Sequence, residues 1–400
     1  MKIIIVGGGA SGLLAATIAK NSHNEVTILE ANNDIGKKIL VTGNGRCNYW
    51  HEGITPSNYY TDDEEHLKAI LMRKDETLDY LNTLGLVPTI KEGYYYPMSN
   101  QASSVRDMFK YQISKRGIDV ITGFKVTSIK KENNIYVISD GIHHITCDKV
   151  IISCGSIASK KGANEKDNIL FKSLGHQINP LLPALVPIII EDAKKYNWAG
   201  IRTHANLTLV SNYKVLKEES GELQLTSSGL SGICTLNLSS IVSRELKKHN
   251  DVSIYLNFMP NIANVEEYLD KRSKMLNNPS INELLNSLIN YKLIGIITNL
   301  LRIKTDTPYE ELSKKEKAWL INNITNFECK VIGTEGYERS QVCTGGELLS
   351  EINPETMESK IVNGLYIIGE ALDVDGECGG YNLAFAFTSG FIAGKSVSYD

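Results

Sequence analysis

The first feature that could carry chemistry is a set of glycines near the start of the chain. Residues 3–6 are apolar and mostly β-branched, which is typical of a buried parallel strand. Gly7, Gly9 and Gly12 follow at the spacing of a dinucleotide-binding turn. In such a turn the first glycine permits the tight bend, the second lets a pyrophosphate approach the backbone, and the third lets the helix pack closely on the strand. The alternative is a glycine turn in an ordinary α/β unit.

A second strand pattern supports the nucleotide interpretation. Residues 25–30 read as a strand that ends at Glu30, where a carboxylate can accept hydrogen bonds from ribose hydroxyls. An acid at this place disfavours a 2′-phosphate, so the sequence predicts FAD or NAD rather than NADP.

The stretch after Glu30 is polar and rich in glycine, and long loops in compact domains are usually functional. Lys38 and Arg46 supply cationic donors beside the flexible backbone of residues 42–45. Such a loop could wrap a large planar cofactor. The alternative is that both cations make solvated surface contacts.

The end of the chain repeats the texture of its start. Residues 363–397 read as an apolar strand, a glycine-containing loop and a helix of small residues. This return predicts an α/β fold in which both ends of the chain form one discontinuous Rossmann-like domain and the middle is inserted. We expect the Rossmann-like domain at 1–185 and 345–400, a β-rich substrate domain at 186–260 and 328–344, and a small helical domain at 261–327.

Turn chemistry divides the strand-like regions. Asparagine and glycine pairs tolerate the left-handed backbone of tight hairpins. Four turns are expected, at Asn133-Asn134, Asp140-Gly141, Asn212-Tyr213 and Ser220-Gly221.

Composition limits the possible partners. The chain has 42 basic and 46 acidic residues and a formal net charge of −4, which argues weakly against a polyanion as the main partner. No apolar run approaches the roughly 18 residues that span a bilayer, and the strand pattern at the start leaves no room for a signal peptide. We therefore expect a cytoplasmic protein without a membrane partner.

The 7 cysteines show no CxxC spacing, so we expect neither a metal site nor a paired disulfide redox centre. Cys343 and Cys378 lie in polar, glycine-rich segments. Each is either a reactive thiol or a buried, inert side chain.

Three long blocks resemble a known protein family. They are GKKILVTGNGRCN, EINPETMESK and GLYIIGEALDVDGECGGYNLAFAFTSG, with weaker matches at YYYPMSNQASSV, LLPALVPI and GLSGICTLNLSS. The combination is similar to a bacterial three-domain FAD flavoprotein family that includes bile-acid reductases, aminoacetone-oxidase-like enzymes and a ribosomal RNA dihydrouridine synthase. The resemblance covers nearly the whole chain and implies a non-covalently bound FAD.

The resemblance also implies roles for residues of the last block. Asp373 would lie near the ribityl or phosphate part of FAD, and the amides from Gly380 to Leu383 would face the N1–C2=O edge of the flavin. A helix N-terminus there stabilises the negative charge of the reduced ring. Together, the motifs and the resemblance predict FAD contacts at Gly7, Gly9, Ala10, Ser11, Gly12, Glu30, Ala31, Lys38, Thr42, Gly43, Asn44, Gly45, Arg46, Cys47, Asn48, Val126, Cys154, Gly155, Gly369, Glu370, Asp373, Gly379, Gly380, Tyr381, Asn382 and Leu383.

The source of electrons and protons is less marked in the sequence. No second strand-glycine-helix motif is present, so NAD(P)H would have to dock transiently over the flavin. Tyr381, Arg339 and Glu347 are the candidate catalytic residues. The chain departs from the family pattern at Cys343 and Cys378, where threonine is usual or common, and at Glu347, where an apolar residue is usual.

These observations predict an FAD-dependent oxidoreductase that uses NAD(P)H to reduce an activated C=C in a small organic substrate. Three alternatives stay open: an amine or aminoketone oxidase that uses O2, a flavin-dependent uridine reductase that acts on RNA, and a non-enzymatic protein in which FAD is a structural or sensing element. The RNA alternative needs a basic surface. It could come from Lys271, Arg272, Lys274, Arg302, Lys304, Lys314, Lys315 and Lys317.

Overall fold

The computed structural model describes residues 1–159, 170 and 173–399. The chain divides into two compact units, the first formed by Met1–Leu182 with Val342–Asp400 and the second by Pro183–Gln341. Both ends of the chain contribute to the first unit, so the predicted discontinuous α/β class is confirmed. The finer division of the inserted part into a β-rich and a helical domain stays a prediction.

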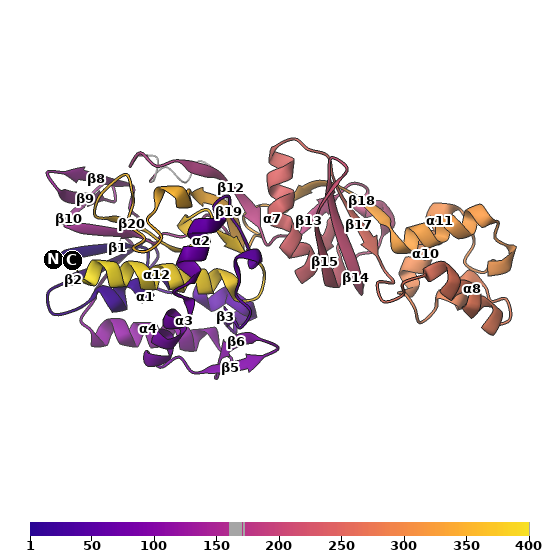
Figure 1. Ribbon diagram of the computed structural model, residues 1–400, viewed down its shortest axis with the longest axis horizontal. Helices are drawn as coiled ribbons and strands as arrows, with labels where there is room; N and C mark the ends of the chain where they lie inside the picture. The colour runs from indigo at the N-terminus through magenta and orange to yellow at the C-terminus, as the bar shows by residue number, and fades with distance from the viewer. Residues whose placement is uncertain (160–169, 171–172, 400) are drawn as a thin grey trace. The chain divides into compact units, whose positions relative to one another are not determined.

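A five-stranded parallel sheet organises the first unit (Figure 1). Its order is β20 (Leu365–Ile367), β11 (Lys149–Ile152), β1 (Lys2–Val6), β2 (Glu25–Glu30) and β7 (Asp119–Thr122). In register, Ile4 pairs with Val150 on one side and Thr27 on the other. Ile3, Ile4 and Ile5 are fully buried, because a parallel strand in the middle of a sheet is covered on both faces.

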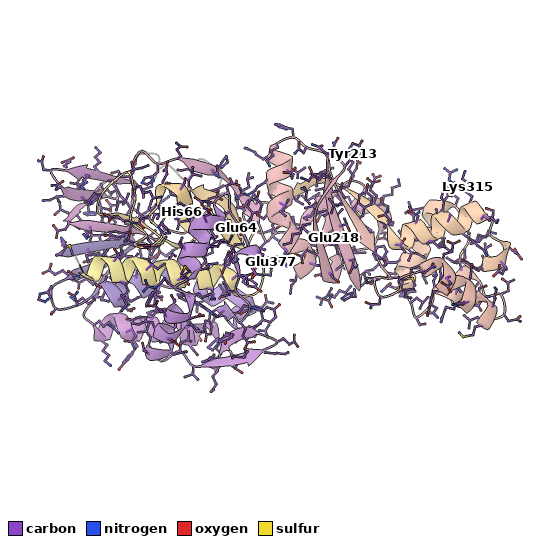
Figure 2. The ribbon with its side chains drawn as sticks, viewed as in Figure 1. Glu64, His66, Tyr213, Glu218, Lys315 and Glu377 are labelled. Carbon is purple, nitrogen blue, oxygen red and sulfur yellow. The ribbon has the colours of Figure 1, made fainter. Side chains whose placement is uncertain are left out.

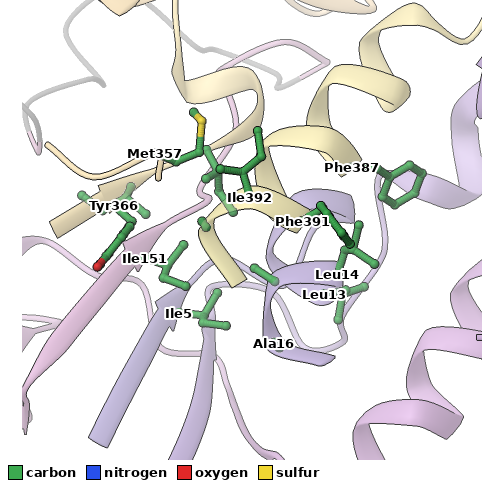
Figure 3. Close-up of a cluster of buried hydrophobic side chains, with 14 of the residues drawn as sticks. Ile5, Leu13, Leu14, Ala16, Ile151, Met357, Tyr366, Phe387, Phe391 and Ile392 are labelled. Carbon is green, nitrogen blue, oxygen red and sulfur yellow. The ribbon is translucent and has the colours of Figure 1, made fainter. Parts of the chain in front are cut away.

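Two helices of small residues pack against each other beside this sheet, α1 (Ala10–Ala19) and α12 (Tyr381–Tyr399) (Figure 1). A Cβ on Gly390 would lie 2.5 Å from the backbone oxygen of Ser11, and one on Gly394 would lie 2.9 Å from that of Ala15. The glycines therefore permit the close approach of the first and last helices. Figure 3 shows the core they share with the sheet, where Leu13 and Leu14 of α1 lie near Phe391 and Ile392 of α12.

Smaller elements complete the first unit. The turns at Asn133-Asn134 and Asp140-Gly141 are confirmed, and they connect β8 (Ser128–Glu132), β9 (Ile135–Ser139) and β10 (His144–Cys147) into an antiparallel sheet. The helices are α2 (Glu64–Leu71), α3 (Lys74–Thr83) and α4 (Ala102–Lys115). The remaining strands pair as β3 (Trp50–His51) with β6 (Tyr94–Pro97) and β5 (Pro88–Lys91), β4 (Tyr59–Tyr60) with β21 (Asp375–Gly376), and β12 (Ile178–Ala184) with β19 (Val342–Glu347).

The second unit contains a closed barrel. Its strands follow the order β13 (Ile188–Ile190), β16 (Gly229–Ser231), β15 (Lys214–Leu225), β14 (Arg202–Ser211), β17 (Val252–Asn257) and β18 (Phe327–Thr334). The helices of this unit are α6 (Ala193–Tyr196), α7 (Ile233–Lys247), α8 (Val265–Met275), α9 (Ile281–Leu285), α10 (Tyr291–Leu301) and α11 (Lys314–Thr325). One hydrophobic cluster includes side chains from both the barrel and these helices.

One of the two hairpins predicted in the barrel is correct. Asn212 and Tyr213 have φ angles of 46° and 65° and connect β14 to β15, and Tyr213 projects fully into solvent (Figure 2). The turn predicted at Ser220-Gly221 is wrong, because both residues lie inside β15 and pair with β14. A Cβ on Gly221 would lie 3.6 Å from the Cβ of Cys234, so this residue faces the start of α7.

Across the described residues, no helix has the length and apolar character that crossing a membrane would require.

Candidate functional site

Of the three glycines of the predicted nucleotide-binding turn, Gly7 and Gly12 are crowded and Gly9 is open. Gly7 has a φ of +107°, and a Cβ there would lie 2.4 Å from the backbone oxygen of Ser153. A Cβ on Gly12 would lie 2.2 Å from the oxygen of Gly7, which explains why the helix needs glycine to lie this close to the strand. Around Gly9, by contrast, no described atom lies within 4 Å of an ideal Cβ. The turn is thus rigid on its inner side and open where a ligand would approach.

The first turn of α1 can bind an anion. In the described part of the chain no side chain caps this helix, and its first turn contains no acid. Uncapped amides at a helix N-terminus, together with the helix dipole, favour a phosphate group. The open space at Gly9 is where a pyrophosphate would need to lie, so the residues fit a dinucleotide.

Glu30 lies at the end of β2 beside this turn. Its Oε2 accepts a hydrogen bond of 2.8 Å from the amide of Gly8, and its Oε1 accepts from the amide and side chain of Asn32 at 2.8 and 2.6 Å. The side chain is buried. These bonds fix the orientation of the carboxylate, which is the requirement for selecting ribose hydroxyls.

The predicted cofactor loop contains the 3-10 segment η1 (Ile39–Gly45) and folds back through left-handed residues, including Gly43, Asn44 and Cys47. Its two cations already have protein partners. Lys38 forms an ion pair of 2.5 Å with Glu370, and the Arg46 guanidinium lies 5.1 Å from the ring centre of Tyr96.

Glu370 joins three distant segments at the edge of the site. Besides Lys38, its carboxylate accepts hydrogen bonds from Ser156 Oγ at 2.7 Å and from the amide of Cys343 at 3.3 Å. A Cβ on Gly155 would lie 3.7 Å from the same carboxylate. Glu370 therefore brings the β11 turn, the cofactor loop and β19 together.

Other predicted contacts also meet. A Cβ on Gly369 would lie 2.5 Å from Ser11 Oγ, so the start of η6 (Gly369–Ala371) adjoins the first turn of α1. Asp373 accepts from Asn179 Nδ2 at 2.5 Å and from the amide of Gly345 at 3.1 Å. Asn382 binds the backbone of Gly376 in β21: its Oδ1 accepts from the Gly376 amide at 2.8 Å, and its Nδ2 donates to the Gly376 oxygen at 2.7 Å.

The N-terminus of α12 is surrounded by aromatic rings. Gly379 and Gly380 precede it with φ angles of +131° and +96°. A Cβ on Gly379 would lie 2.7 Å from Tyr94 Cε1, and one on Gly380 would lie 2.7 Å from the oxygen of Trp50 and 2.8 Å from Asn48 Oδ1. The cofactor loop, through Asn48, therefore packs against this helix start.

We call His51, Tyr59, Tyr94 and Tyr381 the aromatic cluster. The ring centres of His51 and Tyr381 lie 5.0 Å apart, and those of His51 and Tyr94 lie 4.8 Å apart. The hydroxyl of Tyr59 donates a 3.0 Å hydrogen bond to the backbone oxygen of Tyr381. Burial, reinforced by Glu377 and Tyr94, raises the pKa of Tyr381 to about 12, so this phenol is a weaker acid than an exposed tyrosine.

Several cysteines lie in or near the site. Burial raises the pKa of Cys343 to about 12 and that of Cys47 to about 11, so both thiols stay protonated and poorly nucleophilic. Cys154 is exposed, and Cys378 is partly buried.

Glu347, one of the candidate catalytic residues, is fully buried at the end of β19. His176 Nδ1 lies 2.5 Å from Glu347 Oε1 and 3.0 Å from Glu351 Oε2. Burial raises the pKa of Glu347 to about 7, although His176 opposes that rise. Sequence reasoning missed His176 and Glu351, because no short-range pattern connects a lone histidine with two distant glutamates.

Two predicted residues stand apart from these contacts. Arg339 belongs to the second unit, where its guanidinium forms a 3.2 Å ion pair with Glu335 and its side chain is 69% exposed. Val126 is partly buried against the core of the first unit. A contact of either with FAD stays a prediction.

Several basic residues of the helical region have acidic or backbone partners. Lys271 pairs with Glu267 at 2.6 Å, and Lys317 pairs with Glu310 at 2.9 Å. Arg272 Nε donates to the backbone oxygen of Leu284 at 2.8 Å. Lys315 stays on the surface, as Figure 2 shows, with its ammonium 4.6 Å from the ring centre of Trp319.

Comparison with known proteins identifies similar chains. A family model described as "HI0933-like protein Rossmann domain" matches residues 1–396. A 3-dehydro-bile acid delta(4,6)-reductase from Clostridium scindens is 34% identical, with 99% of each chain covered. A ribosomal RNA dihydrouridine synthase from Escherichia coli is 26% identical, with 98% of this chain and 97% of the relative covered.

Among solved structures, a 3-ketosteroid-delta4-(5alpha)-dehydrogenase from Rhodococcus jostii RHA1 has a TM-score of 0.52 at 11% identity. The match covers 99% of this chain and 96% of that one. At this identity the likeness shows a shared fold.

Proposed function

The chain belongs to the HI0933-like Rossmann family of FAD-dependent oxidoreductases, and from that premise we propose that it reduces an activated C=C in an organic substrate with electrons from NAD(P)H. The family and the enzyme class are established by the match over nearly the whole chain. The proposal adds the substrate class, the electron donor and the residues that act.

Groups from both the first and the last part of the chain, all in the first unit, would hold FAD. The open first turn of α1 and the carboxylate of Glu30 fit the pyrophosphate and the ribose. The amides that begin α12 fit the flavin edge that becomes negative on reduction. When bound, FAD supplies hydride transfer.

The aromatic cluster is the observation that carries the substrate proposal. Flat rings beside the start of α12 offer a polarisable surface on which a flat conjugated ligand could stack. The relative at 34% identity is named as a reductase of a bile acid. Both facts favour an unsaturated ring ketone.

Reduction of a C=C also needs a proton for the second carbon. The phenol of Tyr381 carries a proton at neutral pH, as tyrosine ordinarily does, and its ring lies in the aromatic cluster at the start of α12. We assign it the role of proton donor, with Tyr59 holding the backbone of Tyr381 through its 3.0 Å hydrogen bond.

The test is anaerobic stopped-flow mixing of the FAD-loaded protein with NADH or NADPH, followed by a conjugated cyclic enone and, separately, by air. We expect fast reduction by one nicotinamide, fast reoxidation by the enone and slow reoxidation by air. Reduction by an aminoketone with fast reoxidation by air would instead identify an oxidase and refute the proposal.

A second candidate function is supported by the two relatives named as ribosomal RNA dihydrouridine synthases, which are 26% and 27% identical to this chain. In the same experiment, unmodified ribosomal RNA replaces the enone. Reoxidation by RNA but not by the enone would favour this candidate.

A further inference from the structure

A buried cluster in the first unit has more carboxylates than cations. It consists of His176, Glu347 and Glu351, and we call it the acid cluster. The side chains of His176 and Glu347 have no exposed area, and that of Glu351 is 15% exposed. Two ionised glutamates beside a neutral imidazole would leave two negative charges here. Burying unpaired charge is costly, so the cluster must bind a cation or retain a proton.

The hydrogen bonds of Ser359 decide which nitrogen of His176 carries its proton. Ser359 Oγ accepts from the backbone amides of Ile361 and Val362 at 3.0 and 2.9 Å, which occupies both of its lone pairs. Its hydroxyl hydrogen therefore points to His176 Nε2, 3.0 Å away. The neutral ring then carries its proton on Nδ1, which faces the two glutamates.

This tautomer disfavours a metal ion in the acid cluster. A metal ligand must offer a lone pair, and Nδ1 is the ring nitrogen that faces the carboxylates, but its lone pair is taken by the proton. Nδ1 instead donates to Glu351, which also accepts a 3.0 Å hydrogen bond from the amide of Gln177.

Glu347 and His176 compete for the extra proton. Burial lowers the pKa of His176, but the two glutamates outweigh burial and raise it, whereas the hydrogen bond from Ser359 to Nε2 favours a neutral ring and so places the proton on Glu347. Within the described part of the chain, neither of its oxygens has a well-aligned hydrogen bond, although Nδ1 of His176 is close. An ionised Glu347 would pay the full desolvation cost. A protonated Glu347 supplies an O–H that the neighbouring Glu351 can accept, which leaves one negative charge in the cluster.

The acid cluster is hydrogen-bonded to Asp373, a predicted FAD contact. The backbone oxygen of Glu347 accepts a 2.7 Å hydrogen bond from the amide of Asp373. The carboxylate of Asp373 is held by Gly345, two residues before Glu347, and by Asn179, three residues after His176. Of the two strands that hold Asp373, β19 ends in the acid cluster at Glu347, and β12 begins two residues after His176.

We propose that Glu347 is a proton-holding positioning residue, which with His176 and Glu351 keeps Asp373 in place for FAD and weakens FAD binding when it loses its proton. The FAD part of this inference rests on the proposed function. The proton part does not, because it follows from the buried contacts alone.

Among the described residues, two other charged side chains near the acid cluster have partners elsewhere. Asp373 turns its carboxylate to Asn179 and Gly345, and Lys360 faces His66 and the backbone oxygen of Ser350. The pKa of Glu347 is raised to about 7 from the usual 4.5. The folded protein therefore keeps a proton that the unfolded chain releases between those values. Stability falls as pH rises from about 4.5 to about 7 and stays lower above that window.

Infrared spectroscopy of the full-length protein tests the proton directly. We expect the C=O band of an un-ionised carboxylic acid at about pH 6, its loss at about pH 9, and its absence in Glu347→Gln at both. Glu355→Gln is the control, because Glu355 is an exposed carboxylate in the same segment. A wild-type protein without the band, or a band that survives in Glu347→Gln, would overturn the proposal.

FAD titration at the same pH values tests the positioning role. In the wild type and in Glu355→Gln, we expect the Kd for FAD to rise about fivefold between about pH 6 and pH 8.5. In Glu347→Gln, which stays neutral, we expect no such rise. An equal rise in all three proteins would refute the role of Glu347. Failure of every protein to bind FAD would instead refute the proposed function, while the infrared result still decides the proton.

Metal analysis tests the alternative that the acid cluster binds a cation. One equivalent of a divalent metal that copurifies with the wild type and is lost in Glu347→Gln would show that the acid cluster holds a cation, which would overturn the proposal. We expect equal, substoichiometric metal in both proteins.

Discussion

The molecule begins and ends its α/β unit with the same device, a glycine-rich turn that leads into a helix, but the two copies have different surroundings. The turn before α1 faces open space at Gly9 and has a buried carboxylate, Glu30, beside it. The turn before α12 is enclosed by rings, and the ring of Tyr94 occupies the position next to Gly379 where a side chain would lie. Both helices offer amides to a negative group.

The difference shows how neighbouring residues specialise a common motif. At α1 the free space and the fixed carboxylate suit a phosphate with a ribose next to it. At α12 the rings suit a flat, partly apolar group whose edge gains charge. The two turns are thus complementary, and substitutions can separate their roles.

The largest effect is expected where a glycine is needed for packing alone. Gly12→Ala would place a Cβ 2.2 Å from the oxygen of Gly7 and 2.4 Å from Ser153 Oγ, and both are in fixed structure. We expect the free energy of unfolding to fall by about 3 kcal/mol, measured by urea denaturation. The control is Gly295→Ala in α10, which no described atom approaches within 4 Å and which we expect to stabilise by about 0.5–1 kcal/mol. Equal effects would contradict the packing argument.

The second-largest effect is expected in the aromatic cluster at the start of α12. Tyr381→Phe keeps the ring against His51 and removes the proton. We expect the rate of enone reduction to fall about 100-fold, while reduction of the protein by nicotinamide stays unchanged, both measured by stopped-flow absorbance. An unchanged enone rate would exclude Tyr381 as the proton donor. Tyr111→Phe, at an exposed tyrosine of α4, is the control.

The sequence predicted best those features whose determinants are local. The β1 turn, Glu30 and the hairpin at Asn212-Tyr213 each depend on residues that are close in the chain, so spacing and turn chemistry identify them. Ser220-Gly221 failed for the same reason: the pair is typical of a turn, but in the structure both residues lie inside β15 and pair with β14, and the local pattern does not contain this pairing.

The acid cluster and the partners of Glu370 could not be predicted this way. His176, Glu347 and Glu351 come from two distant parts of the chain and meet because β12 pairs with β19. The departure at Glu347 from the family's usual apolar residue was visible in the sequence, but its meaning required the histidine that faces it.

The third effect, at the turn before α1, distinguishes a loss of stability from a loss of FAD binding. Gly9 has a φ of −84°, which alanine adopts freely, and the added methyl group would enter open space. We expect the free energy of unfolding of Gly9→Ala to lie within about 0.5 kcal/mol of the wild-type value. We expect the variant to bind FAD about tenfold more weakly, measured by flavin fluorescence titration. Unchanged FAD affinity would show that no pyrophosphate lies at Gly9.

The smallest effect is expected at the cofactor loop. Lys38 is a predicted FAD contact, yet its ammonium is already held by Glu370, and its side chain is 43% exposed. A partly exposed ion pair contributes about 0–1 kcal/mol, so Lys38→Met should change both stability and FAD affinity less than fivefold in equilibrium constant, about 1 kcal/mol. Thermal unfolding and fluorescence titration measure the two. A loss of FAD affinity far beyond this, with stability unchanged, would mean that Lys38 leaves Glu370 to bind the cofactor. The cofactor loop would then bind the phosphates of FAD together with the turn before α1.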